Sequence, residues 1–544
     1  MGGAERAAIE SMTTPGPGPA LEEETRRRRT FAIISHPDAG KTTLTEKLLL
    51  YGGAIHLAGT VKARRAARHV TSDWMELERE RGISVTSSVL QFEYAGLRVN
   101  LLDTPGHEDF SEDTFRTLVA ADSAVMLLDN RKGVEERTRQ LFDVCRRRRM
   151  PIFTFVNKCD RAGTDPLQLL SDVEGELGFQ CAPVTWPVYR EGVFSGVYHR
   201  RHRHVILFSR RGDHGASRTD SEVVTFEGSA LEDELGSETA RRLHEEVSLL
   251  DGAGHPFDAA AVLAGDQSPV YFGSALTNFG VEPFLEDYLS LAPPPAARLS
   301  SRGPIDPTDP WFSAFVFKIQ ANMDPRHRDR VAFLRICSGR FVPGMEVRVA
   351  RSGRPVRLAA PQQFLGRERV AVDEAWPGDV VGILDRGHLR IGDTLAEGDV
   401  EFSGIPRFPP QHFARVYPAD PLRRKQLDAG LRALSEEGAA QVFFADGDSS
   451  AMPILGAVGL LQFDVMRFRL EHEYGAACRL ERIGLGHPRW VTGPEPAIDR
   501  AARQPGRLRV FDTRGDSLLL FESEFALQWA LDHEPGLSFA ELAP

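Results

Sequence analysis

Short apolar runs alternate with helix-like stretches over the first half of the chain, from residue 30 to about residue 291. The runs lie at 31–34, 99–102, 124–128, 152–156 and 270–272. Such an alternation predicts an α/β domain with a largely parallel sheet covered by helices. Residues 186–265 depart from this rhythm, and we interpret them as an inserted subdomain within a domain that spans 26–291.

The second half of the chain has a different hydrophobic pattern. A Pro- and Ser-rich linker at 292–310 is followed by short alternating strands with turn signals, which predict a β-barrel at 311–405. Residues 406–544 predict an α+β domain of the split βαβ kind, because a strand, a helix, two strands and another helix follow in order. The last sixty residues are harder to place. Residues 1–25, rich in Gly, Pro, Ala and Glu, predict a disordered leader.

Composition narrows the partners and the cellular compartment expected for this 544-residue chain. The net charge of -11 argues against coating of nucleic acid by bulk attraction, so we expect no DNA partner, but a local basic surface for RNA remains open. Five scattered cysteines without a C-x-x-C pair fit a reducing compartment, and we expect the cytoplasm. The sequence has neither a membrane-length apolar run nor a signal-peptide core, so we expect no membrane partner. We expect a monomer.

The first chemical signal follows the apolar run at 31–34. It is the octet Ser35-His36-Pro37-Asp38-Ala39-Gly40-Lys41-Thr42. Between a strand and a helix, the backbone N–H groups of such a loop converge on phosphates, Lys41 reaches the outer phosphates, and the Thr42 hydroxyl binds Mg²⁺. Ser35 stands where the usual pattern has its first glycine.

A second signal follows the run at 99–102. It is Asp103-Thr104-Pro105-Gly106-His107. Asp103 can hold Mg²⁺ through water, and the N–H of Gly106 can approach a terminal phosphate. Ser84, in Arg81-Gly82-Ile83-Ser84, is the candidate hydroxyl that binds Mg²⁺ only when that phosphate is present. A lone histidine such as His107 is more often packed or solvated than catalytic.

The third and fourth signals follow the runs at 152–156 and 270–272. They are Asn157-Lys158-Cys159-Asp160 and Ser274-Ala275. The Asp160 carboxylate can accept hydrogen bonds from two N–H groups of guanine that adenine does not present, while Lys158 lies along the base. Cys159 is interpreted as a bystander whose side chain points away. Since the ends of parallel strands meet at one edge, the four segments predict a single site for GTP or GDP with Mg²⁺.

Other readings remain open on the residues alone. A P-loop kinase of small molecules would not need the segment 157–160, and a scaffold that senses guanine nucleotide without hydrolysing it is disfavoured by the intact phosphate loop and His107. The arginine run 146–149 ends a helix, where it complements the helix dipole, and an RNA contact is the weaker alternative.

The motifs SHPDAGKTT, DWMELERERGIS, DTPGHEDF, NKCDR and GSALTNFGV resemble the translational GTPases. Within them the chain is most similar to the class-II bacterial peptide chain release factors, through FVFKIQANMDPRHRDRVAF at 315–333 and GAVGLLQFDV at 456–465. In that branch Pro37, Ser35 and the RGIS segment are usual features. The resemblance covers nearly the whole chain from about Arg26.

This resemblance implies a ribosome-dependent GTPase of translation termination. Its partners would be ribosomal RNA and proteins and the class-I release factors, whose departure it would promote after peptide release. His107 would then orient the attacking water, and the barrel would contact the small subunit. The rival is a GTPase of elongation or ribosome rescue, against which the absence of two further domains counts.

Overall fold

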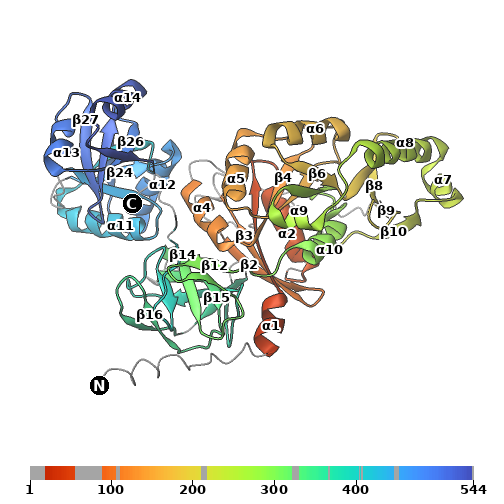
Figure 1. Cartoon of the computed structure of the whole chain (residues 1–544), viewed down its shortest axis with the longest axis horizontal. Coiled ribbons are helices and arrows are strands. Elements are labelled where there is room, and N and C mark those ends of the chain that lie inside the picture. Colours follow the sequence, from red (N-terminus) through yellow and green to blue (C-terminus); the bar gives the residue numbers. More distant parts are fainter. Residues whose placement is uncertain are drawn as a thin grey trace, which may run out of the picture.

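The structure is a computed structural model, and it describes residues 19–54, 88–105, 111–209, 217–321, 330–359, 361–365, 368–403, 405, 409–445 and 452–541. Figure 1 shows an α/β domain (the G domain) from which an arm extends, with a β-barrel domain and a C-terminal domain beside it. None of the described helices is long and apolar enough to cross a membrane.

A single sheet organises the G domain, with the strand order β2-β3-β1-β4-β5-β11-β6. All neighbours pair in parallel except β2, which pairs antiparallel with β3. This confirms the predicted largely parallel sheet. The strands are β1 Arg28–Ser35, β2 Ser88–Tyr94, β3 Leu97–Asp103, β4 Ser123–Asp129, β5 Ile152–Asn157, β6 Gln180–Pro183 and β11 Gln267–Phe272.

Helices cover both faces of this sheet because successive side chains of a strand point in opposite directions. Phe31 and Ile33 of β1 pack with Leu44 in one cluster, whereas Ala32 and Ile34 belong to the other. The first face carries α2 (Lys41–Tyr51) and α10 (Val281–Leu291), and the second carries α4 (Ser111–Ala120), α5 (Glu136–Arg147) and α6 (Pro166–Leu177). The central strands are therefore buried on both sides.

The arm is built from the region in which the insertion was predicted. Antiparallel strands in the order β10-β9-β8-β7 carry α7 (Ser229–Leu235) and α8 (Ser237–Ala253). Helix α9 (Ala259–Ala264) also falls in the predicted insertion, but it packs on β11 of the G-domain sheet. The strands are β7 Thr185–Arg190, β8 Val193–His199, β9 His204–Phe208 and β10 Ser221–Thr225. Figure 1 shows β8, β9 and β10 running outward from the G domain.

Two local predictions differ from the structure. Helix α1 (Pro19–Arg26) lies inside the predicted leader, and it is held because Leu21 and Thr25 are buried and Glu24 pairs with Arg27 at 2.8 Å. Residues 1–18 lie outside the described residues. The predicted linker contains a hairpin of β12 (Arg298–Ser300) and β13 (Gly303–Ile305), anchored where Arg298 donates to the Val119 carbonyl at 2.7 Å. Tertiary contacts therefore order both segments.

The barrel domain has the strand order β17-β16-β21-β14-β15-β20-β18-β19, with antiparallel neighbours, as predicted for a barrel. Ala314, Val316 and Ile319 of β14 fill its interior, whereas Phe315 and Phe317 pack into a cluster shared with the G domain. The strands are β14 Ser313–Ala321, β15 Arg330–Ser338, β16 Glu346–Val349, β17 Pro355–Arg357, β18 Gln362–Leu365, β19 Glu368–Ala371, β20 Val380–Leu384 and β21 Thr394–Ala396.

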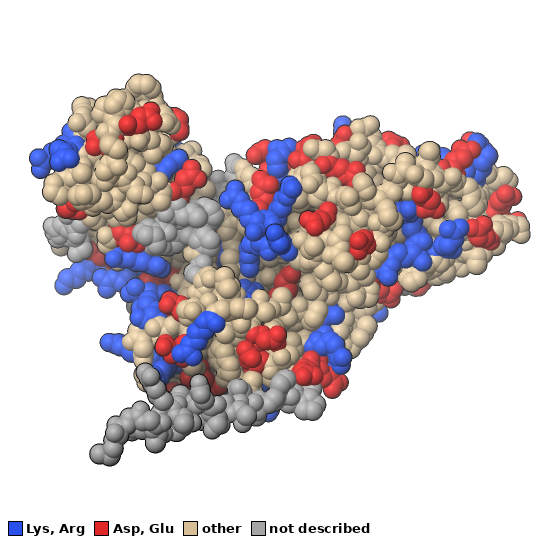
Figure 2. All heavy atoms as spheres, viewed as in Figure 1, with Lys and Arg blue, Asp and Glu red and all other residues tan. Residues whose placement is uncertain are grey.

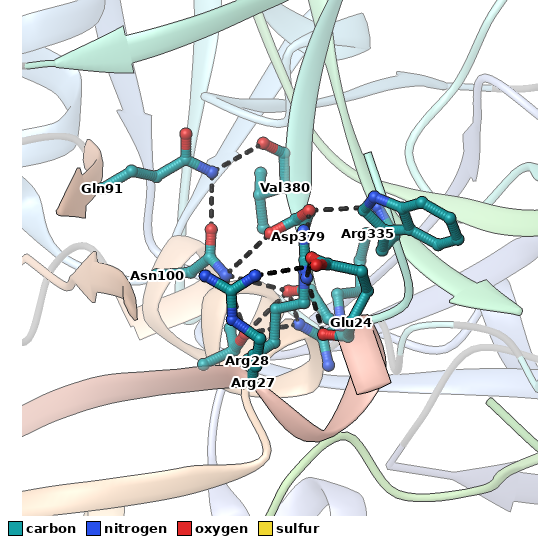
Figure 3. Close-up of polar contacts among 11 residues, drawn as sticks. Glu24, Arg27, Arg28, Gln91, Asn100, Arg335, Asp379 and Val380 are labelled. Carbon is teal, nitrogen blue, oxygen red and sulfur yellow. Dashed lines mark hydrogen bonds and ion pairs between the residues drawn. The ribbon is translucent and has the colours of Figure 1, made fainter. Parts of the chain in front are cut away.

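A buried polar network joins the barrel to the G domain (Figure 3). Arg28 Nε lies 3.0 Å from Asp379 Oδ2, and both side chains are almost fully buried. Arg335 donates to Thr30 Oγ1 at 2.6 Å and forms an ion pair with Asp122. Buried charges are stable only when paired, so these pairs fix how the two domains meet.

The C-terminal domain contains one sheet, in the order β25-β22-β24-β23-β27-β28-β26-β29. The predicted split βαβ unit comprises β22 His412–Pro418, α11 Arg424–Glu436, β23 Gln441–Ala445, β24 Ile454–Ala457, α12 Leu460–His472 and β25 Cys478–Ile483. The same order of elements then recurs in β26 His487–Thr492, α13 Glu495–Ala502, β27 Arg507–Asp512, β28 Ser517–Phe521, α14 Glu524–His533 and β29 Ser538–Ala540. Pairing of β23 with β27 joins the two units.

A cavity of about 1510 Å³ lies where the G domain, the linker, the barrel and the C-terminal domain meet. Arg147, Arg148 and Arg149 contribute to its lining. Figure 2 shows basic side chains gathered on the G domain where it faces the C-terminal domain. Arg148 nevertheless donates to the Leu118 carbonyl at 2.5 Å, and Arg146 donates to the Leu177 carbonyl at 3.0 Å. Arg148 therefore caps the end of α4 and Arg146 caps the end of α6, while both lie at the end of their own helix, α5.

Candidate functional site

Five neighbouring strands of the G-domain sheet end at one edge, and four of them deliver predicted site residues there. In the order β3-β1-β4-β5-β11, their carboxyl ends carry Asp103, Ser35, Asp129, Asn157 and the 273–275 segment. Ligands bind at this edge of open parallel sheets because strand ends and helix N-termini meet there. The structure thus brings together the segments at 35–42, 103–105, 157–160 and 274–275.

The phosphate loop has the backbone geometry that an anion site needs. Asp38 and Gly40 are left-handed, with φ of 65° and 102°, and α2 begins directly after Gly40 without a side-chain cap. The N–H groups in the first turn of a helix lack intrahelical partners, so they are available to a phosphate. A Cβ at Gly40 would lie 2.3 Å from Asn157 Nδ2, so both the backbone angle and the space require glycine.

The two charged side chains expected at the outer phosphates face each other. Lys41 Nζ lies 3.1 Å from Asp103 Oδ1, although the two atoms are not in hydrogen-bonding geometry. Lys41 is 7% exposed and Asp103 is 2% exposed. A buried ammonium and a buried carboxylate at one point suit phosphates and a hard cation, respectively, so the donor set fits a nucleotide with Mg²⁺.

Thr104 and Thr42 occupy different surroundings in this part of the site. The hydroxyl of Thr104 donates to the Ile33 carbonyl at 2.6 Å, so this buried side chain ties the 103–105 segment to β1. Thr42 lies in the first turn of α2 and is half-buried. Of the predicted residues, Ser84, Gly106 and His107 lie outside the described residues.

Asn157 joins two loops of the site. Its amide Nδ2 donates to the Ala39 carbonyl at 2.8 Å, and its Oδ1 accepts from the Ala275 N–H at 2.9 Å. Because both polar atoms of this buried amide are bound to the chain, Asn157 holds the phosphate loop against the 274–275 segment. Its contribution is to fix the relative positions of the phosphate and base regions.

Lys158 and Asp160 lie on the side away from the core. Lys158 Nζ donates to the Asp38 carbonyl at 2.5 Å and to Asp129 Oδ2 at 2.7 Å, which stretches the side chain across the site. Asp160 Oδ1 accepts from the Ser274 hydroxyl at 2.7 Å. The carboxylate is thereby oriented next to the segment expected to contact the base.

Some of the predicted residues can offer only backbone atoms to a ligand. The Cys159 side chain lies in the hydrophobic core, and burial raises the pKa of its thiol to about 12. Ala39 and Ala275 are also packed in a core cluster. His36 lies at the surface of the loop, with Nε2 3.4 Å from Glu135 Oε2.

Asp129 lies beside the predicted site residues and binds Lys158, but the sequence analysis missed it. Burial alone would raise its pKa, but the hydrogen bond from Lys158 and the Arg131 N–H hold the pKa below its ordinary value. The carboxylate therefore stays charged and positions Lys158. The sequence contains a signal that could have identified it. Asp129 directly follows the apolar run at 124–128, just as Asp103 directly follows the run at 99–102.

Comparison with known families agrees with this site. The family model "Elongation factor Tu GTP binding domain" matches residues 26–294, "Elongation factor G domain 2" matches 311–398, and "Class II release factor RF3, C-terminal domain" matches 402–531. A crystal structure of a Thermus thermophilus protein superposes with a TM-score of 0.67 at 25% identity, covering 89% of this chain and 72% of that chain. The fold and the site define a translational GTPase.

Similar curated proteins narrow the class to one family. Peptide chain release factor 3 of Symbiobacterium thermophilum is 55% identical over 96% of this chain and 99% of its own length. Peptide chain release factor 3 of Gloeothece citriformis is 50% identical over 96% of this chain and 97% of its own length. The chain belongs to the peptide chain release factor 3 family, as its motifs predicted.

Proposed function

We propose that this GTPase acts on the ribosome at the end of translation, where it promotes the departure of class-I release factors after peptide release and then hydrolyses GTP and leaves. The observation that carries the proposal is the row of strand-end segments from Asp103 to Ser274, combined with a C-terminal domain of the release-factor type. We expect the protein to act in the cytoplasm as a monomer. Its partners would be ribosomal RNA and proteins, and neither DNA nor a membrane would be involved.

The phosphate side of the site would carry the reaction, an in-line attack of water on the γ-phosphate. Lys41 and the N–H groups at the start of α2 would stabilise charge on the transferred phosphoryl group, because they are already in place in a buried site. Thr42 and Asp103, with Ser84, would hold Mg²⁺, which neutralises phosphate charge. His107 would orient the attacking water.

The base side would select guanine. The Asp160 carboxylate, held by Ser274, would accept hydrogen bonds from guanine, and Lys158 would lie along the base plane. Asp160→Asn replaces an acceptor by a donor, so nucleotide preference should shift from guanine to xanthine in a competition binding assay. Asp165→Asn is the matched control, because Asp165 caps α6 outside the site. Undiminished guanine preference in Asp160→Asn would remove Asp160 as the base-reading residue.

The decisive experiment measures how fast a class-I release factor dissociates from ribosomes after peptide hydrolysis, with this protein and GTP present or absent. We expect faster dissociation with both present. No acceleration would leave the GTPase but remove the termination role. His107→Ala should keep GTP binding nearly intact while abolishing ribosome-stimulated phosphate release, and unchanged release would exclude His107 from catalysis.

A further inference from the structure

Three histidines, His199, His202 and His204, lie together at the base of the arm. Strand β8 ends at His199 and β9 begins at His204, and in the loop between them the Arg203 N–H donates to the His199 carbonyl at 2.8 Å. This bond closes the loop into one tight turn. His202 is thereby brought back over His199, with ring centroids 4.3 Å apart.

Asp287 of helix α10 completes a three-residue cluster. Its Oδ2 lies 2.9 Å from His199 Nε2, and both side chains are buried, whereas His202 is exposed. One ligand atom from each of these residues lies within 4.8 Å of the other two. Two imidazoles and a carboxylate are a donor set that binds Zn²⁺ and leaves a further position for water.

His199 is not accounted for as an ordinary core residue. It is 3% exposed, and its Nδ1 has no hydrogen-bond partner among the described residues. A buried polar atom left unpaired is destabilising, so packing alone is a poor reason for a histidine at this position. Coordination through Nε2, the ring nitrogen that faces Asp287 Oδ2, would give this buried imidazole a function that packing does not.

The surrounding charges permit a cation. Arg200 turns away to Asp251 at 2.7 Å, and Arg203 turns away to Glu227 at 2.5 Å. Arg201 lies 3.8 Å from Asp287 Oδ1 and also stacks over the Phe257 ring. The positive charge of Arg201 offsets the negative charge of Asp287, so the cluster has no net repulsion for a divalent ion. Arg201 nevertheless competes with such an ion for the carboxylate.

We propose that His199, His202 and Asp287 bind a divalent transition-metal ion such as Zn²⁺ and thereby join the arm to helix α10. Figure 1 shows α10 next to the base of the arm. Helix α10 begins at Val281, directly after the loop that contains Ser274 and Ala275. The ion would brace the base side of the nucleotide site from behind. It is distinct from the oxygen-rich Mg²⁺ site, because imidazole ligands favour transition metals.

The test is a titration of the full chain, saturated with GDP and Mg²⁺, with Co²⁺ followed by its visible absorption and with Zn²⁺ in competition with a chromogenic chelator. We expect saturation at one equivalent. His202→Ala should weaken binding at least about tenfold, as loss of a ligand removes at least as much affinity as loss of a supporting residue. His388→Ala, which removes an exposed histidine of the barrel, should bind as the parent chain does.

A second variant separates the proposal from damage to the fold. Arg201→Gln removes the competing charge, so it should bind the metal several-fold more tightly, which a folding defect cannot cause. The proposal is overturned by any of three results: Co²⁺ and Zn²⁺ fail to saturate a site, His202→Ala binds as tightly as the parent chain, or Arg201→Gln binds more weakly. None of these readouts depends on GTP hydrolysis.

Discussion

The G domain makes two very different joints. Towards the barrel it buries paired charges, Arg28 with Asp379 and Arg335 with Asp122, and it shares a hydrophobic cluster with the barrel. Figure 3 shows Arg28 and Asp379 at this joint. Towards the C-terminal domain, α4 contributes hydrogen bonds at the rim of a cavity of about 1510 Å³.

The difference lies in what separation would cost. Opening the barrel joint would expose apolar surface and unpair buried charges, which is expensive. Opening the joint at α4 would exchange hydrogen bonds such as that from Arg116 to the Gly438 carbonyl, at 2.8 Å, for bonds to water. We therefore expect the barrel to move with the G domain and the C-terminal domain to be the part that yields.

The largest effect should come from Asp379→Asn. This change removes the charge facing Arg28 and should lower the free energy of unfolding by about 3 kcal/mol, at the low end for a broken buried pair because Glu24 also pairs with Arg28. Urea denaturation measures it. Asp399→Asn, whose fully exposed side chain lies 3.7 Å from Arg302, is the control and should leave stability unchanged. Equal stability of the two variants would contradict a rigid barrel joint.

Gly438→Ala should loosen the other joint. Gly438 has a φ of 70°, and a Cβ there would lie 1.6 Å from Arg116 Nη1, so alanine strains the backbone and displaces the arginine. Docking of the C-terminal domain should weaken by about 1–2 kcal/mol. Single-molecule distance measurements between dyes on the G and C-terminal domains should then show a broader distribution. Gly475→Ala has a similar φ of 62° but open space around it, so it controls for backbone strain.

Arg116→Ala should have a smaller effect at the same joint. It removes the hydrogen bond to the Gly438 carbonyl without straining the backbone, so docking should weaken by about 1 kcal/mol. Arg241→Ala, which disrupts an exposed pair within α8, serves as the control. In the double variant with Gly438→Ala, docking should weaken by less than the sum of the two single effects, because both changes disrupt the same contact. Full additivity would show that the two residues act separately.

The smallest effect concerns pH. Burial would raise the pKa of Glu24, but hydrogen bonding to Arg28 and the charges of Arg28 and Arg27 hold it below its ordinary value of 4.5. The charge of Glu24 therefore stabilises the folded chain above about pH 4.5, and this stabilisation is lost as the pH falls through the lower pKa that Glu24 has in the folded state. The stability advantage of the parent chain over Glu24→Gln should shrink as urea denaturation is repeated from about pH 7 to about pH 4. A constant difference would mean that the Glu24 charge does not contribute.

Much of the fold, and the meeting of the four motif segments at one edge of the sheet, could be predicted because the signals are local. An apolar run ending in Asp103, Asn157 or Ser274 places that residue at a strand's end, and parallel strands bring their ends to one edge. The barrel and the first split βαβ unit were also visible from alternation and from Leu427, Leu431 and Leu434 on one helix face. Asp129 was missed although it obeys the same strand-end rule.

The sequence by itself determined the class of the protein, because phosphate and base recognition require particular side chains at fixed offsets from strands. The tertiary structure decided where these side chains lie relative to one another and how the domains meet. Asn157 is turned inward to hold two loops, Phe315 faces the G domain instead of the barrel interior, and the final residues repeat the preceding unit. His199 meets Asp287 across 88 residues of sequence. These features depend on contacts between segments far apart in the chain, which local patterns do not encode.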